Sequence, residues 1–400
     1  MATGFQLTDL NHGEGEVVNP MTRRGPRRLF RPPPHGWVPL ALCTTLFGVA
    51  ILAFPTTAGQ ASSVAQLPGN TLSVGTGADA TVLTSCRLAG TPEFSVFDPA
   101  NGYIYTFSSY TGSTRSVAVL RAPCTLVGYV RIPGLSSAWL GGAAYDPQTK
   151  EIYVTNPPGF EVYVIQDLSL VRTIPVPPDD NWAAGPGAIA YDPATGKLLA
   201  AEVYSNLVDV LSGTTYLDRF KESSFSNARP DTVMVLPNNE VYFVNTWSEW
   251  GEIGPSESVS DITVVNASTY QRITKIPTGP TPEGLAWNPT LDQLYVGFGN
   301  CSGSAGIAVI DTASNDITRT IVLPKMTCPV GLGYAPATRQ VFVTEEYRDL
   351  LWMVTPSGRL TSIPFFQGSG GGTGVTFDPL TSNMYVCGPH RMYVISLGGS

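Results

Sequence analysis

Three acidic residues occupy the same position in a recurring sequence pattern. Glu93, Asp231 and Glu283 each lie five residues before the residue that precedes a repeated proline corner. If the copies of the pattern surround one axis, these carboxylates converge, and carboxylate oxygens completed by waters and carbonyls are the ligands that Ca²⁺ prefers. The sequence therefore predicts a calcium site, with a solvated acidic rim as the alternative. At the same position the other four copies carry uncharged residues, namely Gly141, Gly187, Val330 and Thr373.

A second group of residues combines aromatic rings with carboxylates. The longest copy of the pattern contains TWSEWGEIGPSESVSD at 246–261, and TEEYRD at 344–349 belongs to a later copy. Aromatic rings beside carboxylates could stack on a sugar or anchor a protein partner. Alternatively, the long loop folds over the edge of its sheet and buries both tryptophans. The predicted ligand-binding residues are Trp247, Glu249, Trp250, Glu252, Glu345, Glu346 and Tyr347.

Nucleophilic catalysis has little support in the sequence. His390 is the only histidine after residue 35, so a Ser-His-Asp or Cys-His arrangement would need it. Cys387 lies three residues before it and could form a dyad or half of a metal site, but the stretch CGPHR is typical of a Gly-Pro turn. Three histidines for a catalytic zinc are not available in this part of the chain. The glycine-rich stretch 368–374 has no phosphate-binding motif. We therefore predict no catalytic residue.

The cysteines predict disulfide bonds in an oxidising compartment. Cys301 and Cys328 are the first candidate pair, because both belong to loops at one end of the predicted fold. Cys86 and Cys387 share the last repeat, where a bridge would lock the structure, although a strand between them makes the geometry doubtful. Small buried thiols are the alternative for these two residues. No C-x-x-C spacing indicates zinc or thioredoxin chemistry.

The residues above are positioned by a repeat that spans most of the chain. An apolar run, a corner resembling Asp-Pro and an alternating apolar run recur seven times, with separations of 48, 46, 44, 52, 47 and 43 residues. This period is that of a four-stranded propeller blade. The corner prolines are Pro99, Pro147, Pro193, Pro237, Pro289, Pro336 and Pro379.

Each period contains four strand patterns, so the sequence predicts an all-β, seven-bladed propeller. The alternation in runs such as IYVTN (152–156) gives each sheet two apolar faces, and a ring of copies covers each face with a neighbour. After the seventh corner only three strand patterns remain. We therefore predict that a strand at 80–88, at the front of the repeat region, joins the last blade and closes the ring.

The motifs IYVTN, YDP and VIDTASN (309–315) resemble the YVTN-type seven-bladed β-propeller repeat proteins. The resemblance covers about residues 80–397 and implies an exported or surface-attached protein. It indicates the fold and not the function, since such folds host binding modules, lactonases and lyases.

The charge distribution argues against nucleic acid as a partner. Residues 1–36 contain five arginines and three acids, which gives a net charge of +2. Since the whole chain has a net charge of −8, the rest of the chain has a net charge of −10. An acidic body repels phosphate backbones. Protein, glycan or cation ligands fit this body better.

The N-terminal region predicts an export or anchoring signal. Residues 37–54 form an uncharged stretch of 18 residues after the arginine cluster, suited to a transmembrane segment or a signal peptide. The arginines favour a cytoplasmic N-terminus, with the remainder extracellular or at the cell surface. The predicted organisation is a disordered basic leader at 1–36, the hydrophobic segment at 37–54, a linker at 55–79 and the propeller at 80–397.

Three functions agree with these features. The first is an extracytoplasmic binding protein with a protein, glycan or cation ligand at the channel mouth. The second is a metal-dependent propeller enzyme of lactonase or lyase type, in which the cation polarises a carbonyl and a carboxylate acts as base. The third is a structural protein of the cell envelope whose faces pack against copies.

Overall fold

The computed structural model describes residues 75–76, 80–109, 116–132, 140–178, 185–202, 205–221, 230–246, 260–299, 304–323, 328–347, 350–364 and 371–397. All of them belong to the second of the two units into which the chain divides, Thr44–Ser400. The predicted leader, the hydrophobic segment and most of the predicted linker lie outside the described residues and stay predictions. Within the described part, no helix has the length and apolar character required to cross a membrane.

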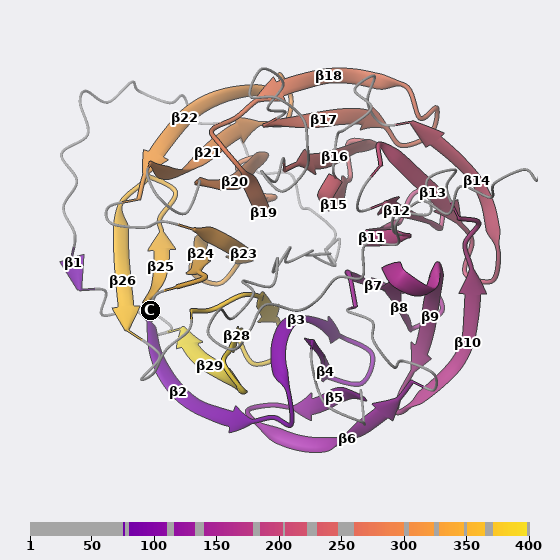
Figure 1. Ribbon diagram of the computed structural model, residues 1–400. Helices are drawn as coiled ribbons and strands as arrows, with labels where there is room; N and C mark the ends of the chain where they lie inside the picture. The colour runs from indigo at the N-terminus through magenta and orange to yellow at the C-terminus, as the bar shows by residue number, and fades with distance from the viewer. Residues whose placement is uncertain are drawn as a thin grey trace, which may run out of the picture. The chain divides into compact units, whose positions relative to one another are not determined.

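Seven antiparallel sheets of four strands surround a central axis (Figure 1). We number them blades 1 to 7. The inner strands are β3 (Thr91–Asp98), β7 (Ala143–Asp146), β11 (Pro186–Asp192), β15 (Pro230–Leu236), β19 (Pro282–Asn288), β23 (Pro329–Ala335) and β27 (Val375–Asp378). The second strands are β4 (Tyr103–Ser109), β8 (Glu151–Asn156), β12 (Lys197–Glu202), β16 (Glu240–Asn245), β20 (Gln293–Gly299), β24 (Gln340–Glu345) and β28 (Asn383–Gly388).

The third and outer strands complete each blade. The third strands are β5 (Ser116–Arg121), β9 (Glu161–Gln166), β13 (Leu207–Leu211), β17 (Asp261–Asn266), β21 (Ala305–Asp311), β25 (Leu350–Val354) and β29 (Arg391–Leu397). The outer strands are β6 (Thr125–Arg131), β10 (Ser169–Pro175), β14 (Tyr216–Lys221), β18 (Arg272–Pro277), β22 (Asp316–Val322), β26 (Leu360–Pro364) and β2 (Ala80–Arg87). A single 3₁₀ turn, η1 (Pro157–Gly159), is the helical element of the described residues. The predicted all-β, seven-bladed propeller is confirmed.

The repeated corner folds as the sequence indicates. In blade 1 the Asp98 carboxylate accepts a hydrogen bond from the Ala100 backbone N–H at 2.8 Å, and Asp146 and Asp192 accept equivalent bonds in blades 2 and 3. An acidic or amide side chain before proline therefore fixes its own turn. The last turn residue has a positive φ in every blade, which glycine or a polar residue tolerates. These residues are Gly102, Lys150, Gly196, Asn239, Asp292, Arg339 and Ser382.

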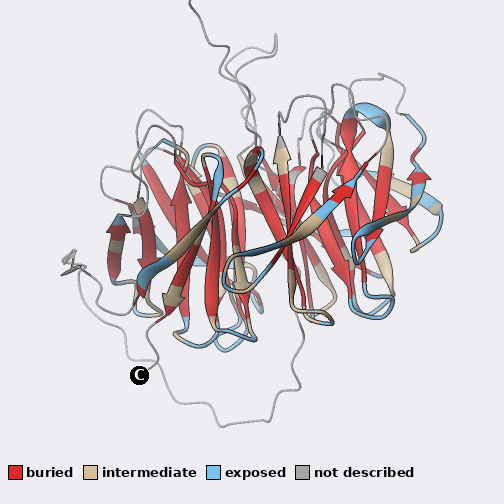
Figure 2. Cartoon of the chain, turned by 90° about the horizontal axis from the view of Figure 1, so that it is seen from below, coloured by how far each residue is buried: buried red, intermediate tan, exposed pale blue. Residues whose placement is uncertain are grey.

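The apolar core lies between the blades rather than in one centre. The buried apolar residues form seven clusters, and each cluster joins two consecutive blades. Figure 2 shows this pattern as buried strands with exposed positions along the rim and the turns. Tyrosine recurs in the middle of the cluster, on the second strand, because a large ring fills the gap between two sheets. The fully buried tyrosines are Tyr105, Tyr153, Tyr242, Tyr295 and Tyr385.

The last blade takes its outer strand from the front of the repeat region. β2 pairs antiparallel with β29, from Ala80 opposite Leu397 to Arg87 opposite Arg391. The sequence predicted this pairing for 80–88. A two-residue strand, β1 (Gly75–Thr76), precedes it and pairs parallel with β26 of blade 6, which the sequence did not predict.

A disulfide bond joins blade 7 to blade 1. Cys86 near the end of β2 is bonded to Cys124 in the turn before β6, with their Cα atoms 5.5 Å apart. The considered bridge between Cys86 and Cys387 is therefore wrong, and Cys387 is a buried free thiol. Met392 pairs with Cys86 on one side and with Cys387 on the other, so a whole strand separates these two cysteines. Outer strands instead follow the circumference of the ring, which brings the end of β2 to the start of β6 (Figure 1).

Substituting Cys124 by serine should lower the stability of the propeller. The bond closes a stretch with a sequence separation of 38 residues, and such a cross-link stabilises by about 2–4 kcal/mol. We expect a drop of several degrees in the melting midpoint, measured by circular dichroism. The double variant Cys86→Ser, Cys124→Ser should have the same melting midpoint as the single variant, because both lack the same bond. An unchanged midpoint would show that the bond contributes nothing to the contact between blades 7 and 1.

Candidate functional site

The two ends of the propeller differ in the length of their connections. At one end, the turns from inner to second strand and from third to outer strand contain two to five residues. At the other end lie the connections from second to third strand and from outer strand to the next inner strand, and the connection at 246–260 is the longest of them. We call these ends the tight-turn face and the long-loop face. Variable loops on a rigid scaffold are where propeller-like folds carry recognition.

The predicted acidic register coincides with a distortion of the inner strands. β3, β11, β15, β19 and β23 each contain a β-bulge close to the long-loop face. Glu93 and Asp231 are the extra residues of the bulges in β3 and β15, and Glu283 precedes the extra residue Gly284 in β19. A bulge bends the strand and re-aims a side chain, and bulges are frequent beside functional sites.

The structure places the three acids on separate blades. Glu93 is half-buried in blade 1, Glu283 is half-buried in blade 5, and Asp231 is in blade 4, where the position of its backbone but not of its side chain is described. Among the side chains that are described, no group of three or more His, Cys, Asp or Glu residues is arranged to hold a metal. Because the position of the Asp231 carboxylate is not described, the calcium site stays a prediction.

The second predicted group is divided between surface and interior. Glu345, the last residue of β24, is fully buried, Glu346 is half-buried, and Tyr347 is 48% exposed. A surface ligand would therefore meet Glu346 and Tyr347, with Glu345 beneath them. Burial raises the pKa of Glu346, and a hydrogen bond with Tyr347 opposes this shift.

The entry into blade 7 packs directly on these glutamates. The Gly371 N–H donates a hydrogen bond to the Glu346 carbonyl at 2.6 Å. A Cβ atom on Gly371 would lie 1.9 Å from the Glu345 carbonyl oxygen, so this contact requires glycine. The backbone of Glu346 is therefore fixed by the adjacent blade, and a half-buried carboxyl with a shifted pKa marks a candidate binding residue.

Sequence reasoning missed a row of buried polar residues beneath the long-loop face. The final residue of the second strand is an amide or a carboxylate in four blades, and all four are buried. The Asn or Glu that ends each of the sequence runs IYVTN, LLAAE, VYFVN and VFVTE is the sequence signal that could have predicted them. They are Asn156, Glu202, Asn245 and Glu345.

Blade 3 contains the most highly charged member of this row. The Arg219 guanidinium lies 2.7 Å from Glu202 and 2.7 Å from Asp209, and both carboxylates are fully buried. The Ser205 hydroxyl donates a further hydrogen bond to Glu202 at 2.7 Å. Burial opposes the charge of Arg219, but hydrogen bonding to Asp209 and the two negative charges raise its pKa overall. Buried charges of this kind persist only when they are paired.

The residues considered for catalysis do not form a site. His390 is exposed in the turn between β28 and β29, and its Nδ1 lies 3.5 Å from the Thr91 hydroxyl. The Cys387 thiol is 3.9 Å from the Ser95 hydroxyl, and complete burial raises the pKa of Cys387 to about 12. A thiol with such a pKa is not a nucleophile at neutral pH.

Several predicted residues lie outside the described part of the chain. They are Trp247, Glu249, Trp250, Glu252 and Cys301. Cys328 at the start of blade 6 is disulfide-bonded, and no described residue is its partner. The pairing of Cys301 with Cys328 therefore stays a prediction.

Comparison with solved structures agrees with the architecture. Virginiamycin B lyase from Staphylococcus aureus aligns with a TM-score of 0.65 and 14% identity over 80% of this chain and 100% of the lyase, including a catalytically inactive histidine-to-alanine variant with quinupristin. Hydrazine synthase from Kuenenia stuttgartiensis aligns with a TM-score of 0.60 and 14% identity, covering 78% of this chain and 97% of that one. The Pan2 WD40 domain from Neurospora crassa aligns with a TM-score of 0.61 and 10% identity, covering 80% and 96%.

These similarities define a seven-bladed β-propeller with lyase-type and WD40-type structural neighbours. Identities of 10–14% establish the fold alone. No protein-family model matches the sequence, and no curated protein matches it. Membership in the YVTN-type family therefore stays a prediction.

Substituting Glu346 by glutamine should change how stability depends on pH. Its pKa in the folded chain is raised above the ordinary 4.5, so the folded state binds more protons than the unfolded state as the pH rises past that value. Stability contributed by this group therefore falls with rising pH. The melting midpoint of Glu346→Gln relative to wild type should increase from about pH 4 to about pH 7. Asp218→Asn is the control, because Asp218 is exposed. If the difference in melting midpoint from wild type depended on pH equally for both variants, the effect assigned to the burial of Glu346 would be refuted.

Substituting Arg219 by methionine should strongly destabilise the chain. It would leave Glu202 and Asp209 buried without their cation, which costs roughly 3–5 kcal/mol. Lys275→Met is the matched control, because its partner Asp261 is 13% exposed and keeps contact with water. Chemical denaturation should show a larger loss for Arg219→Met. Equal losses would contradict the role assigned to complete burial.

Proposed function

We propose that the chain is an extracytoplasmic binding protein whose protein or glycan ligand docks on the long-loop face. The observation that carries the proposal is the asymmetry of the connections, since every long connection of the ring leaves from this one face. Inner-strand bulges and the half-buried Glu346 lie at the same end. The opposite face has only tight turns, which the corner motif fixes.

The composition of the connections on the long-loop face supports a ligand with polar and ring-like groups. Four tryptophans belong to these connections, and acidic residues in them outnumber basic ones. Tryptophan offers a large amphipathic surface, and carboxylates accept hydrogen bonds from sugar hydroxyls or basic side chains. The tryptophans are Trp139, Trp182, Trp247 and Trp250. The acids are Asp179, Asp180, Glu222, Glu249, Glu252, Glu257, Glu346 and Asp349, against Arg115, Arg229, Lys325 and Arg348.

Two observations support a location outside the cytoplasm. The Cys86–Cys124 disulfide fits an oxidising compartment. The charge-free stretch 37–54 behind an arginine cluster fits an export signal or anchor, with membrane association through that stretch if it is retained.

An enzyme of lactonase or lyase type is the second candidate. The likeness to virginiamycin B lyase favours it, together with acids at the inner-strand bulges that could hold Ca²⁺ as a Lewis acid. Replacing one histidine inactivates that lyase. In this chain the single histidine of the described residues is His390 in its exposed turn, so a lyase-type reaction here would need a different base, for which Glu93 or Glu283 is available.

Ligand binding can be tested with an immobilised glycan array and a displayed peptide library as probes. For any ligand found, Trp247→Ala with Trp250→Ala, or Glu346→Gln with Tyr347→Ala, should weaken binding about tenfold or more, which is 1.4 kcal/mol. Leu380→Ala on the tight-turn face is the control, because Leu380 is 66% exposed. Binding that survives both double variants would overturn the assignment of the long-loop face.

The calcium prediction has a separate test. Thermal melting with CaCl₂ and with EDTA should differ for the wild type, because an ion bound only to the folded chain stabilises it. Glu283→Ala should remove the difference. Identical melting curves with CaCl₂ and with EDTA would contradict the predicted calcium site. They would also leave the enzyme candidate without its mechanism.

A further inference from the structure

The rim of the propeller contains seven equivalent seams, and five of them are closed. In six of the seven seams, the outer strand of one blade faces the turn between third and outer strand of the next blade (Figure 1). The Cys86–Cys124 bond closes the seam between blades 7 and 1. Arg172 donates to the Gly213 carbonyl at 2.9 Å between blades 2 and 3. Phe220 stacks on Tyr270 between blades 3 and 4, with ring centroids 4.7 Å apart.

The two remaining closures use an arginine and a strand. Arg319 donates to the Pro356 carbonyl at 3.1 Å between blades 5 and 6. Between blades 6 and 7 there is no such turn, because the third and outer strands of blade 7, β29 and β2, are not consecutive in sequence; β1 pairs with the edge of β26 instead. The seams between blades 1 and 2 and between blades 4 and 5 are the ones that remain as grooves.

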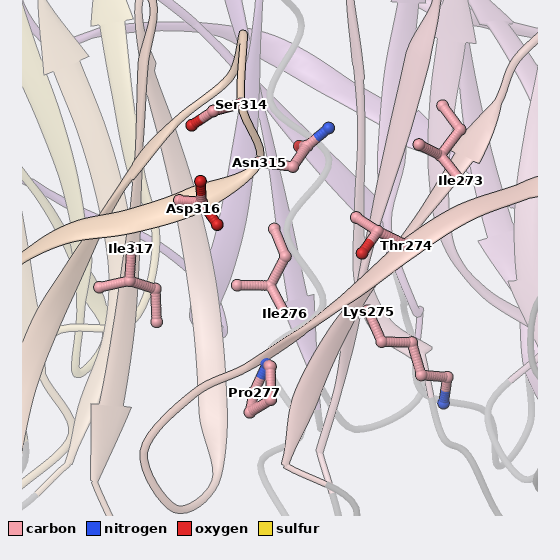
Figure 3. Close-up of a pocket in the computed structure, with 9 residues that line it drawn as sticks. All are labelled: Ile273, Thr274, Lys275, Ile276, Pro277, Ser314, Asn315, Asp316 and Ile317. Carbon is pink, nitrogen blue, oxygen red and sulfur yellow. The ribbon is translucent and has the colours of Figure 1, made fainter.

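The groove between blades 4 and 5 is lined by both polar and apolar residues, beside an outer edge of β18 that pairs with no other described strand. It encloses about 390 Å³ between β18 and the turn that leads into β22. Figure 3 shows Ile276 and Pro277 of β18 near Ile317 of β22, with Asp316 at the same side. Ile273 is 46% exposed.

The edge of β18 repeats the edge that β1 occupies. β1 pairs in parallel with Thr361 and Ser362, in the stretch Thr361-Ser-Ile-Pro364 of β26. The same register of β18 reads Thr274-Lys-Ile-Pro277, since Thr274 and Thr361 pair with equivalent residues of their third strands. No other outer strand has this Thr-x-Ile-Pro pattern. The chain therefore carries an occupied and an unoccupied copy of one edge.

Bulges occupy one common register of the outer strands. Six outer strands contain a bulge, and β26 is the one without it. Bulges twist an edge away from pairing. In β18 the bulge residue is Ile273, and the stretch after it is regular, as in the other five bulged strands. What distinguishes β18 is that this stretch, Thr274–Pro277, matches the stretch of β26 that pairs with β1.

We propose that the groove between blades 4 and 5 binds an extended peptide segment of a partner protein, which adds to the edge of β18 as β1 adds to β26. Backbone hydrogen bonds provide affinity in this mode, and the groove selects the side chains. The segment is made of small and β-branched residues, like β1, because Ile276, Pro277 and Ile317 are among the residues that line the groove.

The charges that line the groove and the existing pairing of β1 with β26 limit which partner segments can bind. Asp316 takes part in none of the ion pairs of the described residues, and Lys275 is paired with Asp261 at 3.2 Å, so an acidic segment is disfavoured. A second copy of this chain is a poorer occupant, because its own β1 is already paired with its own β26.

The probe is a labelled synthetic peptide with the sequence of residues 70–78, NTLSVGTGA, added to the full chain. We expect saturable binding by fluorescence anisotropy and slower hydrogen exchange at Thr274–Pro277. Ile273→Arg should weaken binding about tenfold or more. Leu217→Arg is the matched control, since Leu217 is the bulge residue of β14, is 48% exposed and borders a closed seam. A peptide with Val74→Pro and Thr76→Pro should not bind, because proline lacks the N–H.

Three results would overturn the proposal. The first is the absence of binding to a chain that melts normally. The second is binding that Ile273→Arg leaves unchanged, which would place the peptide on β26 in exchange for β1. The third is self-association of the chain that Ile273→Arg abolishes, which would make a second copy the occupant.

Discussion

A four-stranded β-sheet with two apolar faces cannot be stable alone, and the whole molecule follows from this constraint. Each of the seven clusters of buried residues belongs to two blades, so no blade owns a core. The ring leaves no sheet face uncovered, provided that the last blade has four strands. The chain meets this condition by returning β2 from its front, and the Cys86–Cys124 bond holds that strand to blade 1.

Because sheet faces are used for packing, recognition is left to the ends and the rim. Close to the long-loop face, bulges distort the inner strands, and a row of buried polar residues ends the second strands at the same end of the ring. Arg219 with its two carboxylates shows that this layer includes paired charges. At the rim, the seam between blades 4 and 5 is bridged by the hydrogen bond from the Tyr242 hydroxyl to Asn315 at 2.7 Å and keeps a groove between β18 and β22. The proposed ligand recognition and the proposed peptide docking therefore concern different surfaces of one scaffold.

Most of the fold could be predicted because its signals are local and repeated. The Asp-Pro corners and the alternating strand patterns each follow from a few adjacent residues, and counting the strand patterns after the seventh corner predicts that the last blade takes its fourth strand from residues 80–88. The partner of Cys86 could not be predicted, because it depends on outer strands that run along the circumference and meet the next blade. The burial of Glu345 and the pairing of Arg219 also depend on neighbouring strands. The acidic register follows from counting residues back from each corner, but the sequence shows neither the bulges at these positions nor where the side chains point.

The most direct test of the account compares chains that begin at residue 77 and at residue 89. The first keeps β2 and the second lacks it. Thermal unfolding followed by circular dichroism should show one cooperative transition for the first chain. For the second we expect a broad transition at markedly lower temperature, since blade 7 loses its outer strand and blade 1 its covalent neighbour. Equal, cooperative transitions for both would contradict the claim that stability depends on mutual covering of blades around a closed ring.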